Sequence, residues 1–245
     1  MIIVPLAGEG SRFKEVGIFQ PKWSLQVGNE SILSRAIQSI LNSRNVNERI
    51  VLGCLAEQVE FVSQVLSIGV LNQISLVTLD YSTKGQAETV LRILEKIQVN
   101  ESERLIIWCG DSAFKSEAFE FGSKAGNWLL VSDLPGEHWS FVREYHGEVI
   151  EVAEKSRISN HASVGLYAFE TVQVFLDTKP LDLRLGYKES FVAPLYNTLI
   201  SKEISIEMYA IDPEDYFPLG TPIEILKTAT RMNWNLPNEL SYFTP

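Results

Sequence analysis

The sequence predicts an α/β protein with a mixed, mostly parallel central sheet and helices on both faces. Through residues 1–125, apolar runs of strand length alternate with segments whose apolar residues recur at helical spacing. This alternation is typical of parallel β-α-β units. In residues 126–245, strand-like runs follow one another with short polar turns between them. No linker-like or repetitive stretch separates the halves, so we expect a single domain over residues 1–245.

The first half provides the parallel part of this sheet. We expect strands at residues 2–6, 49–55, 73–79 and 104–109, and helices at 31–41, 57–66 and 87–97. Ligands on such sheets bind beyond the carboxyl ends of the strands. The glycine-rich loop at 7–13 and the segment at 109–112 fall at such ends, so we expect the functional site there.

The second half reads as a series of hairpin-like strands with two helices. The strands are expected at residues 128–134, 139–145, 147–154, 162–170 and 205–211, and the helices at 188–200 and 222–231. The segment at 146–148 reads as a hairpin turn. The tail at 235–245 has no clear period.

Composition and charge exclude several classes of partner. The formal net charge of -10 argues against binding a nucleic-acid backbone, because a polyanion would be repelled. Cys54 and Cys109 each end an apolar run, which predicts buried thiols and neither a disulfide nor a zinc site. No stretch approaches the roughly 20 apolar residues of a membrane helix, and the apolar start lacks a basic leader. We therefore expect a cytoplasmic protein with no membrane partner.

The loop after the first expected strand combines glycines with cations. Gly8 and Gly10 let backbone N–H groups approach an anion closely. Arg12 can bind a polyphosphate through its forked guanidinium, and Lys22 adds a point charge behind a proline. Phe13 stands where a dinucleotide-binding loop has its third glycine, and the mononucleotide P-loop pattern is absent. The pattern indicates phosphate binding, with a plain strand-to-loop turn as the alternative.

The spacing G-x-G-x-R-F followed by P-K resembles the signature of the sugar-phosphate nucleotidyltransferases, which include small cytidylyltransferases of bacterial surface-polysaccharide synthesis. Similar motifs continue along the chain: KGQAETVL at 84–91, CGDS at 109–112, VAEKS at 152–156, ASVGLYAF at 162–169 and FPLGTPIEIL at 217–226. The resemblance implies a Rossmann-like, GT-A-type nucleotidyltransferase fold. It also implies a nucleotide-binding half at 1–125 and an acceptor-binding half at 126–245.

The resemblance also assigns roles to individual residues. It implies Arg12, Lys22 and Asp111 as catalytic residues, with Asp111 as the ligand of Mg²⁺. The implied nucleotide-binding residues are Leu6, Ala7, Gly8, Gly10, Ser11, Arg12, Lys22, Asp80, Gly85, Gln86, Ala87 and Gly110. The implied acceptor-binding residues are Glu154, Lys155 and Gly165. Each residue also has a structural alternative. Asp111 could cap the segment that follows it, Lys22 could be a surface lysine, and Glu154 and Lys155 could form a solvated ion pair.

The chain departs from the family pattern at two positions. Many relatives place a second metal-binding aspartate where this chain has Pro218. The second ligand then comes from elsewhere, with Asp212 and Asp215 as candidates, or Asp111 acts alone. At Asp80, uridylyl- and thymidylyltransferases often have a glutamine that reads the base. Because a carboxylate only accepts hydrogen bonds, Asp80 favours the exocyclic amine of cytosine, although guanine would also satisfy it.

These features predict an enzyme that joins an NTP (CTP or UTP/dTTP) to a sugar phosphate and releases pyrophosphate with Mg²⁺, for capsule or surface-polysaccharide synthesis. Three alternatives stay open: a cytidylyltransferase for a non-sugar phosphorylated molecule, a GT-A-type glycosyltransferase, and a non-catalytic nucleotide-binding relative. The expected partners are the NTP and the phosphorylated acceptor. Trp234 and Tyr242 near the C-terminus hint at exposed aromatic contacts, which leaves a homo-oligomer open.

Overall fold

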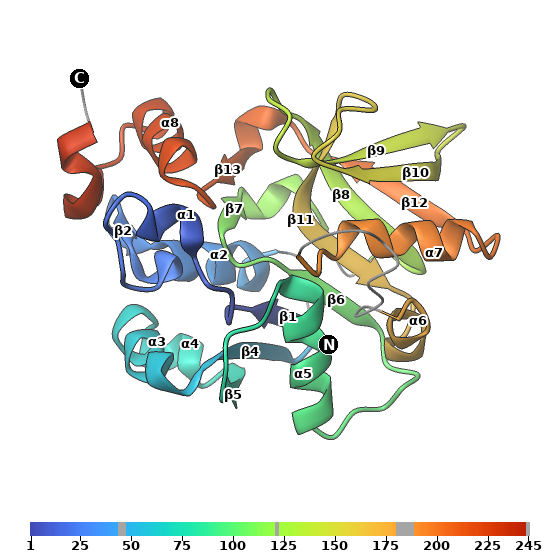
Figure 1. Ribbon diagram of the computed structural model, residues 1–245, viewed down its shortest axis with the longest axis horizontal. Helices are drawn as coiled ribbons and strands as arrows, with labels where there is room; N and C mark the ends of the chain where they lie inside the picture. Colours follow the sequence, from blue (N-terminus) through green and yellow to red (C-terminus); the bar gives the residue numbers. More distant parts are fainter. Residues whose placement is uncertain (44–47, 121–122, 180–188, 244–245) are drawn as a thin grey trace.

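One mixed sheet runs through both halves of the chain (Figure 1). The computed structural model describes residues 1–43, 48–120, 123–179 and 189–243. Among these residues the sheet has nine strands in the order β5-β4-β1-β6-β11-β8-β12-β10-β9. Their bounds are β1 Ile2–Pro5, β4 Ile50–Leu55, β5 Ile74–Leu79, β6 Leu105–Trp108, β8 Asn127–Asp133, β9 Ser140–Tyr145, β10 Glu148–Glu154, β11 His161–Phe169 and β12 Ile206–Ala210.

The sheet is mixed, as predicted, but it is not mostly parallel. Parallel pairs join β5, β4, β1 and β6, and also β8 and β12. The antiparallel pairs are β6–β11, β11–β8, β11–β9, β12–β10 and β10–β9. For one of these pairs the connection gives the reason: β9 and β10 are joined by a tight turn at 146–147, which only antiparallel neighbours allow. The other antiparallel pairs join strands that are not consecutive in the chain.

Two short ribbons and a set of helices complete the described structure. The ribbons pair β2 (Gln26–Val27) with β3 (Glu30–Ser31), and β7 (Ser112–Phe114) with β13 (Tyr216–Pro218). The helices are α1 Ser11–Lys14, α2 Ile32–Leu41, α3 Val59–Val65, α4 Ile68–Leu71, α5 Gln86–Lys96, α6 Val172–Asp177, α7 Tyr196–Ile200 and α8 Pro222–Met232. No helix in these described ranges is long and apolar enough to span a bilayer.

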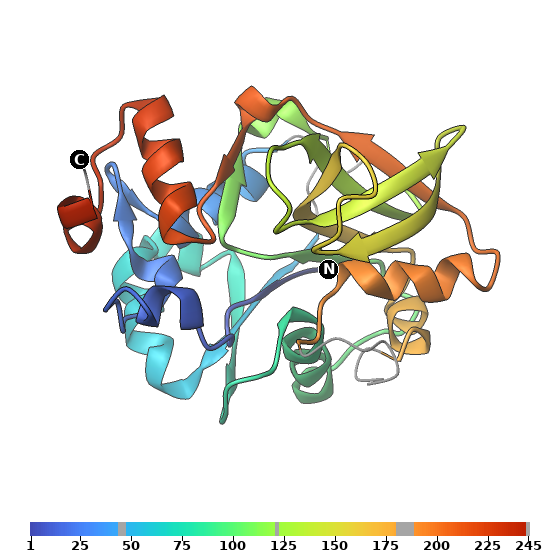
Figure 2. The ribbon, with the colours of Figure 1, turned by 45° about the horizontal axis from the view of Figure 1, so that its top comes forward.

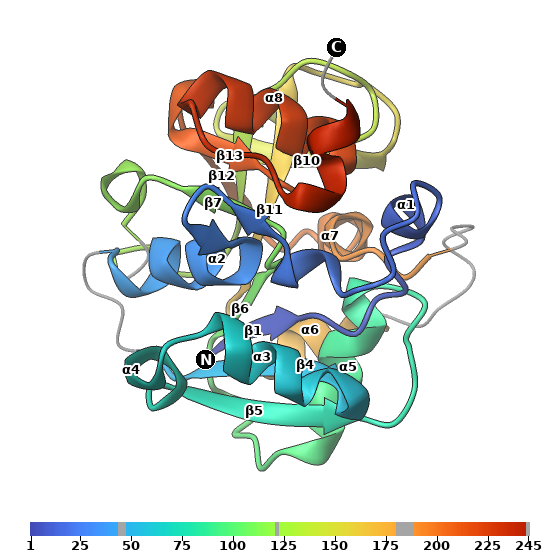
Figure 3. The same ribbon diagram turned by 90° about the vertical axis from the view of Figure 1, so that its left-hand side faces the viewer.

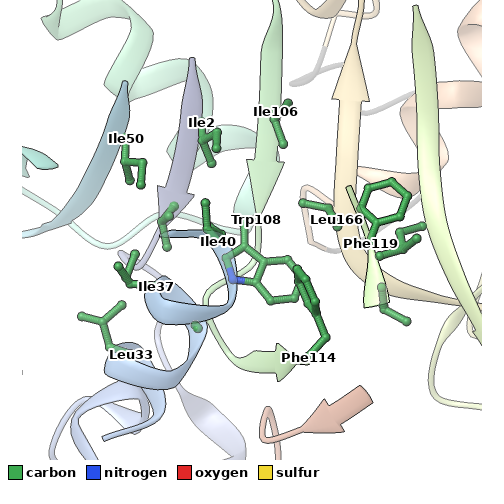
Figure 4. Close-up of a cluster of buried hydrophobic side chains, with 14 of the residues drawn as sticks. Ile2, Leu33, Ile37, Ile40, Ile50, Ile106, Trp108, Phe114, Phe119 and Leu166 are labelled. Atoms are coloured by element: carbon green, nitrogen blue, oxygen red, sulfur yellow. The ribbon is translucent and has the colours of Figure 1, made fainter. Parts of the chain in front are cut away.

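Helices cover both faces of the sheet, as predicted. On one face, the apolar side of α2 packs on β1, β4 and β6, and Leu33, Ile37 and Ile40 face Ile2 and Ile106 (Figure 4). The other face carries α5, α6 and α7 in a second buried cluster. Both cysteines are buried free thiols, as the sequence predicted.

The last helix returns to the beginning of the chain. In a third apolar cluster, Ile225 and Ala229 of α8 pack with Phe13 of α1 and Val27 of β2. Figure 3 shows α8 lying over the blue N-terminal part of the chain. Trp234 joins this region half-buried, with the Arg35 guanidinium 3.8 Å from the centre of its ring. The expectation that Trp234 is exposed is therefore wrong, and the side chain of Tyr242 lies outside the described residues.

The helix predicted at 188–200 is shorter than expected. The helical part comprises a 3-10 turn at Ala193–Leu195 followed by α7, which lies along β10 (Figure 2). Residue 188 lies outside the described residues. The backbone of Ser190 bonds instead to Lys84 and Ala87, so it cannot form the first helical turn.

Candidate active site

A cavity of about 1270 Å³ opens at the carboxyl ends of β1, β4, β5 and β6. This exceeds the roughly 300–1,000 Å³ of an ordinary small-molecule pocket, so it has room for two small ligands. Two residues predicted to bind nucleotide, Ala7 and Ala87, are fully buried and do not line it. The predicted residues that line it are Leu6, Gly8, Gly10, Ser11, Arg12, Lys22, Asp80, Gly85, Gln86, Gly110 and Asp111.

The glycine loop after β1 is held against the loop after β5. Gly8 pairs with Thr83 in an isolated bridge, and the Thr83 N–H donates to the carbonyl oxygen of Ala7 at 3.1 Å. Gly10 has a φ of 64°, a left-handed conformation that favours glycine. Apart from the residues next to each glycine in sequence, no heavy atom of the described chain lies within 4 Å of where a Cβ would stand at Gly8 or Gly10. The backbone there is open to a ligand.

Lys22 and Asp111 meet in this cavity. The Lys22 ammonium donates to Asp111 Oδ2 at 2.6 Å, and both side chains are partly exposed. Gly110 lets the chain turn here, because its φ is 71° and a Cβ would lie 2.8 Å from Val4 Cγ1. A cation and a carboxylate thus share one wall of the cavity, which is an arrangement suited to phosphate and metal chemistry.

Glu154 and Lys155 lie together at the end of β10. Only 6% of the Glu154 side chain is exposed, so it is not a solvated surface carboxylate. Burial raises the pKa of Glu154, while a hydrogen bond from Ser140 Oγ and the charge of Lys155 act in the opposite direction. Lys155 Nζ lies 4.0 Å from Glu154 Oε1 and 3.7 Å from Glu189 Oε1. Glu189 lines the cavity and connects this pair to it.

Gly165 has a packing role behind the cavity wall. Its φ is 87°, and a Cβ there would lie 3.1 Å from the Sγ atom of Cys109. The Cys109 N–H donates to the Gly165 carbonyl oxygen at 3.0 Å. Burial raises the pKa of the Cys109 thiol well above its usual value, so the wall here is uncharged. Gly165 therefore lets β11 approach the end of β6.

Asp80 lines the cavity, but its carboxylate already has a partner. Lys96 of α5 donates to Asp80 Oδ2 at 2.8 Å, and 76% of the Asp80 side chain is exposed. The base-reading role of Asp80 stays a prediction, since a base would have to share this carboxylate with Lys96.

The late glycine motif folds against Asp111. The Leu219 N–H donates to the Asp111 carbonyl oxygen at 3.1 Å. A Cβ at Gly220 would lie 2.9 Å from Asp111 Oδ2 and 3.3 Å from Glu224 Oε2. Glu224, in the first turn of α8, is buried and its Oε1 lies 2.8 Å from His138 Nε2. Two carboxylates therefore flank the small residue at position 220.

The other two carboxylates considered from the sequence have different partners. Asp212 Oδ1 accepts from the Glu214 N–H at 2.8 Å, and Asp215 Oδ1 accepts from Lys115 Nζ at 2.5 Å. Sequence reasoning missed Glu224, although the acidic position of the G-T-P-x-E motif was a signal for it.

Asp111 and Glu224 fit a weakly held divalent ion better than an all-protein metal cage. Within the residues that the structure describes, no group of three or more His, Cys, Asp or Glu could hold a metal. Mg²⁺ commonly takes only one or two carboxylates, and substrate phosphates and water complete its octahedron. The donor set found here meets that requirement.

Fold and motif order together define a class: the chain resembles the sugar-phosphate nucleotidyltransferases. Neither a family model nor a curated protein matches it. Its fold is similar to that of a nucleoside-diphosphate-sugar pyrophosphorylase from Vibrio cholerae, with a TM-score of 0.79 and 26% identity over 94% of this chain and 100% of that one. These values confirm the resemblance that the motifs indicated.

More distant structures share the same fold. An inositol-1-phosphate CTP transferase from T. maritima has a TM-score of 0.71 and 17% identity over 91% of this chain and 90% of its own. A UDP-glucose pyrophosphorylase from Acinetobacter baumannii has a TM-score of 0.69 and 14% identity over 99% of this chain and 96% of its own. The chain is thus similar to enzymes that use different nucleotides, and the fold does not select among them.

Proposed function

We propose that the chain is a Mg²⁺-dependent nucleotidyltransferase that joins an NTP to a sugar phosphate and releases pyrophosphate. The observation that carries this proposal is the Lys22–Asp111 pair, 2.6 Å apart, in a cavity bordered by an open glycine loop. The similarity to the nucleoside-diphosphate-sugar pyrophosphorylase from Vibrio cholerae supports the same reaction class.

The chain's contribution to this reaction is positioning and charge. Arg12 and Lys22 offset the charge of the triphosphate, and Lys155 holds the phosphate of the acceptor. An oxygen of that phosphate attacks the α-phosphorus, and the bond from the α-phosphorus to the oxygen of the β-phosphate breaks. Pyrophosphate leaves with the bonding electron pair. No general base is required, because the attacking phosphate is already ionised, and in-line placement supplies most of the rate.

Asp111 and Glu224 would hold Mg²⁺ in this proposal. When bound, the ion would neutralise charge on the phosphates as they react. Glu224 would replace the carboxylate that many relatives carry at the position of Pro218. Both carboxylates approach the same point beside Gly220, where a Cβ would lie 2.9 Å from Asp111 Oδ2 and 3.3 Å from Glu224 Oε2, and this supports the assignment.

We assign the reaction to one domain, with residues 1–125 binding the nucleotide and 126–245 binding the acceptor. The single sheet that crosses both halves supports the assignment to one domain. We also propose a role in capsule or surface-polysaccharide synthesis, which rests on the sequence resemblance alone.

The test is pyrophosphate release from the purified chain with Mg²⁺. CTP, UTP, dTTP, GTP and ATP are each combined with a panel of sugar 1-phosphates, inositol 1-phosphate and phosphocholine. We expect release that requires one NTP, one acceptor and the metal together. Release with no combination would overturn the proposed function, whereas release with a non-sugar acceptor alone would overturn the sugar assignment.

Asp80→Gln is expected to lower the use of CTP relative to UTP. An amide can donate a hydrogen bond to the O4 of uracil, which a carboxylate cannot do. The ratio of kcat/KM values for the two nucleotides is the measurement. Lys96→Gln is the control, since it frees the carboxylate of Asp80 from its 2.8 Å ion pair without removing it. An unchanged ratio in Asp80→Gln would remove Asp80 from base reading.

A further inference from the structure

The segment Glu189–Val192, here called the bridging segment, is bonded to the predicted nucleotide motif. The Ser190 carbonyl oxygen accepts from the Ala87 N–H at 3.0 Å, and the Ser190 N–H donates to the Lys84 carbonyl oxygen at 3.1 Å. A Cβ at Gly85 would lie 2.5 Å from the Ser190 oxygen. The absence of a side chain at Gly85 therefore allows this close approach of two backbones.

The bridging segment also holds the side chain of Lys155. The Lys155 ammonium lies 4.7 Å from the centre of the Phe191 ring and 3.7 Å from Glu189 Oε1. The backbone of Lys155 is fixed separately, because its N–H donates to the Trp139 carbonyl oxygen at 2.9 Å. The direction of the Lys155 side chain therefore depends on Glu189 and Phe191 of the bridging segment, together with Glu154, whose Oε1 lies 4.0 Å from the ammonium.

The segment is anchored in the core on its carboxyl side. Val192 and Leu195 are buried in the second apolar cluster. The Asn197 side chain accepts from the Val152 N–H at 3.0 Å and donates to the Val152 carbonyl oxygen at 2.7 Å. Val152 lies two residues before Glu154 on β10. One continuous stretch thus connects the nucleotide motif, Lys155 and the strand that carries the acceptor residues.

We propose that the bridging segment sets the position of Lys155 relative to the nucleotide, and that Phe191 is the positioning residue through which it does so. This inference rests on the proposed function. In-line transfer requires the acceptor phosphate to be held at a fixed place beside the α-phosphorus. The face of the Phe191 ring attracts the Lys155 ammonium and limits its rotamers. Phe191 therefore acts on the acceptor through Lys155.

A double-mutant cycle tests this proposal. Phe191→Leu keeps an apolar side chain but removes the ring face, and Phe191→Tyr keeps the face. The acceptor is glucose 1-phosphate, or the panel member that the wild type turns over fastest. For each protein we measure kcat and the acceptor KM at saturating NTP, and the NTP affinity by calorimetry. The proteins are the wild type, Phe191→Leu, Phe191→Tyr, Lys155→Ala, and Lys155→Ala combined with Phe191→Leu.

We expect Phe191→Leu to raise the acceptor KM roughly 2- to 30-fold, which is the range of a cation–π contact. The NTP affinity of Phe191→Leu should equal that of the wild type, and Phe191→Tyr should keep the acceptor KM at the wild-type value. In the Lys155→Ala background, Phe191→Leu should have little further effect, because the partner is gone.

Three results would overturn the inference while the proposed function stands. The first is an unchanged acceptor KM in Phe191→Leu. The second is a fall in the NTP affinity of Phe191→Leu as large as the rise in its acceptor KM. The third is a rise in acceptor KM caused by Phe191→Leu in the Lys155→Ala background that is as large as in the wild type. A wild-type chain that releases no pyrophosphate would show instead that the proposed function is wrong, and the inference would fall with it.

Discussion

Asp111→Asn lowers the rate of pyrophosphate release by roughly 10²–10³-fold, on the scale of a lost preorganised electrostatic contact. The variant keeps the shape of the side chain and removes the charge that would hold Mg²⁺. The fold should remain intact, because the Asp111 carbonyl oxygen still accepts from Leu219 and the side chain is partly exposed. Breaking a partly exposed ion pair costs little stability. Release is measured with the best substrate pair, and thermal unfolding is followed in parallel.

Asp215→Asn is the matched control for this variant. Asp215 also pairs with a lysine, Lys115, but neither residue lines the cavity. The Asp215→Asn variant should therefore release pyrophosphate at the wild-type rate. Near-normal release from Asp111→Asn would contradict the metal assignment.

Glu224→Gln tests the second carboxylate of the proposed Mg²⁺ site. It should raise the Mg²⁺ concentration that gives half-maximal pyrophosphate release, because one ligand is weakened. If that concentration does not change, Glu224 is not a ligand, and Asp111 remains as the side-chain ligand of the proposed pair.

Much of the fold could be predicted because its signals are local. The apolar period of α2 and the β-branched runs of β1, β4 and β6 are set by side chains within one element, so their existence and order followed from the sequence. The site was expected beyond the carboxyl ends of the strands, and the cavity lies there. Because β1 and β6 are parallel neighbours in the sheet, the segments that follow them lie side by side. The resulting 2.6 Å contact joins residues 89 positions apart.

What could not be predicted depends on contacts between distant segments. Backbone hydrogen bonds to Lys84 and Ala87 keep Ser190 out of a helix, whereas the sequence around it predicted one. The ribbon of β7 and β13 pairs Ser112 with Pro218, which no local pattern reveals. The same pairing brings Gly220 and Glu224 against Asp111, which lies far earlier in the chain. The motif pointed to an acidic residue at position 224, but its closeness to Asp111 depends on this long-range pairing.

Lys22→Ala should reduce kcat/KM for the NTP by roughly 10²–10³-fold, because the cavity loses a cation aimed at the triphosphate. The affinity for NTP, measured by calorimetry, should fall as well, in contrast to Phe191→Leu. Lys115→Ala is the matched control, since it removes an equivalent lysine from the Asp215 pair outside the cavity. Normal NTP affinity in Lys22→Ala would contradict the phosphate-binding role of the loop.

The Lys22–Asp111 contact also determines how the two variants combine. If Lys22 binds the reacting phosphates together with Asp111, adding Lys22→Ala to Asp111→Asn should lower activity further, although by less than Lys22→Ala does alone, because residues in one network are not additive. If Lys22 only neutralises Asp111, then Lys22→Ala should have no effect once Asp111 is already asparagine. Residual pyrophosphate release in the double variant therefore distinguishes a lysine that binds the nucleotide from one that only pairs with the carboxylate.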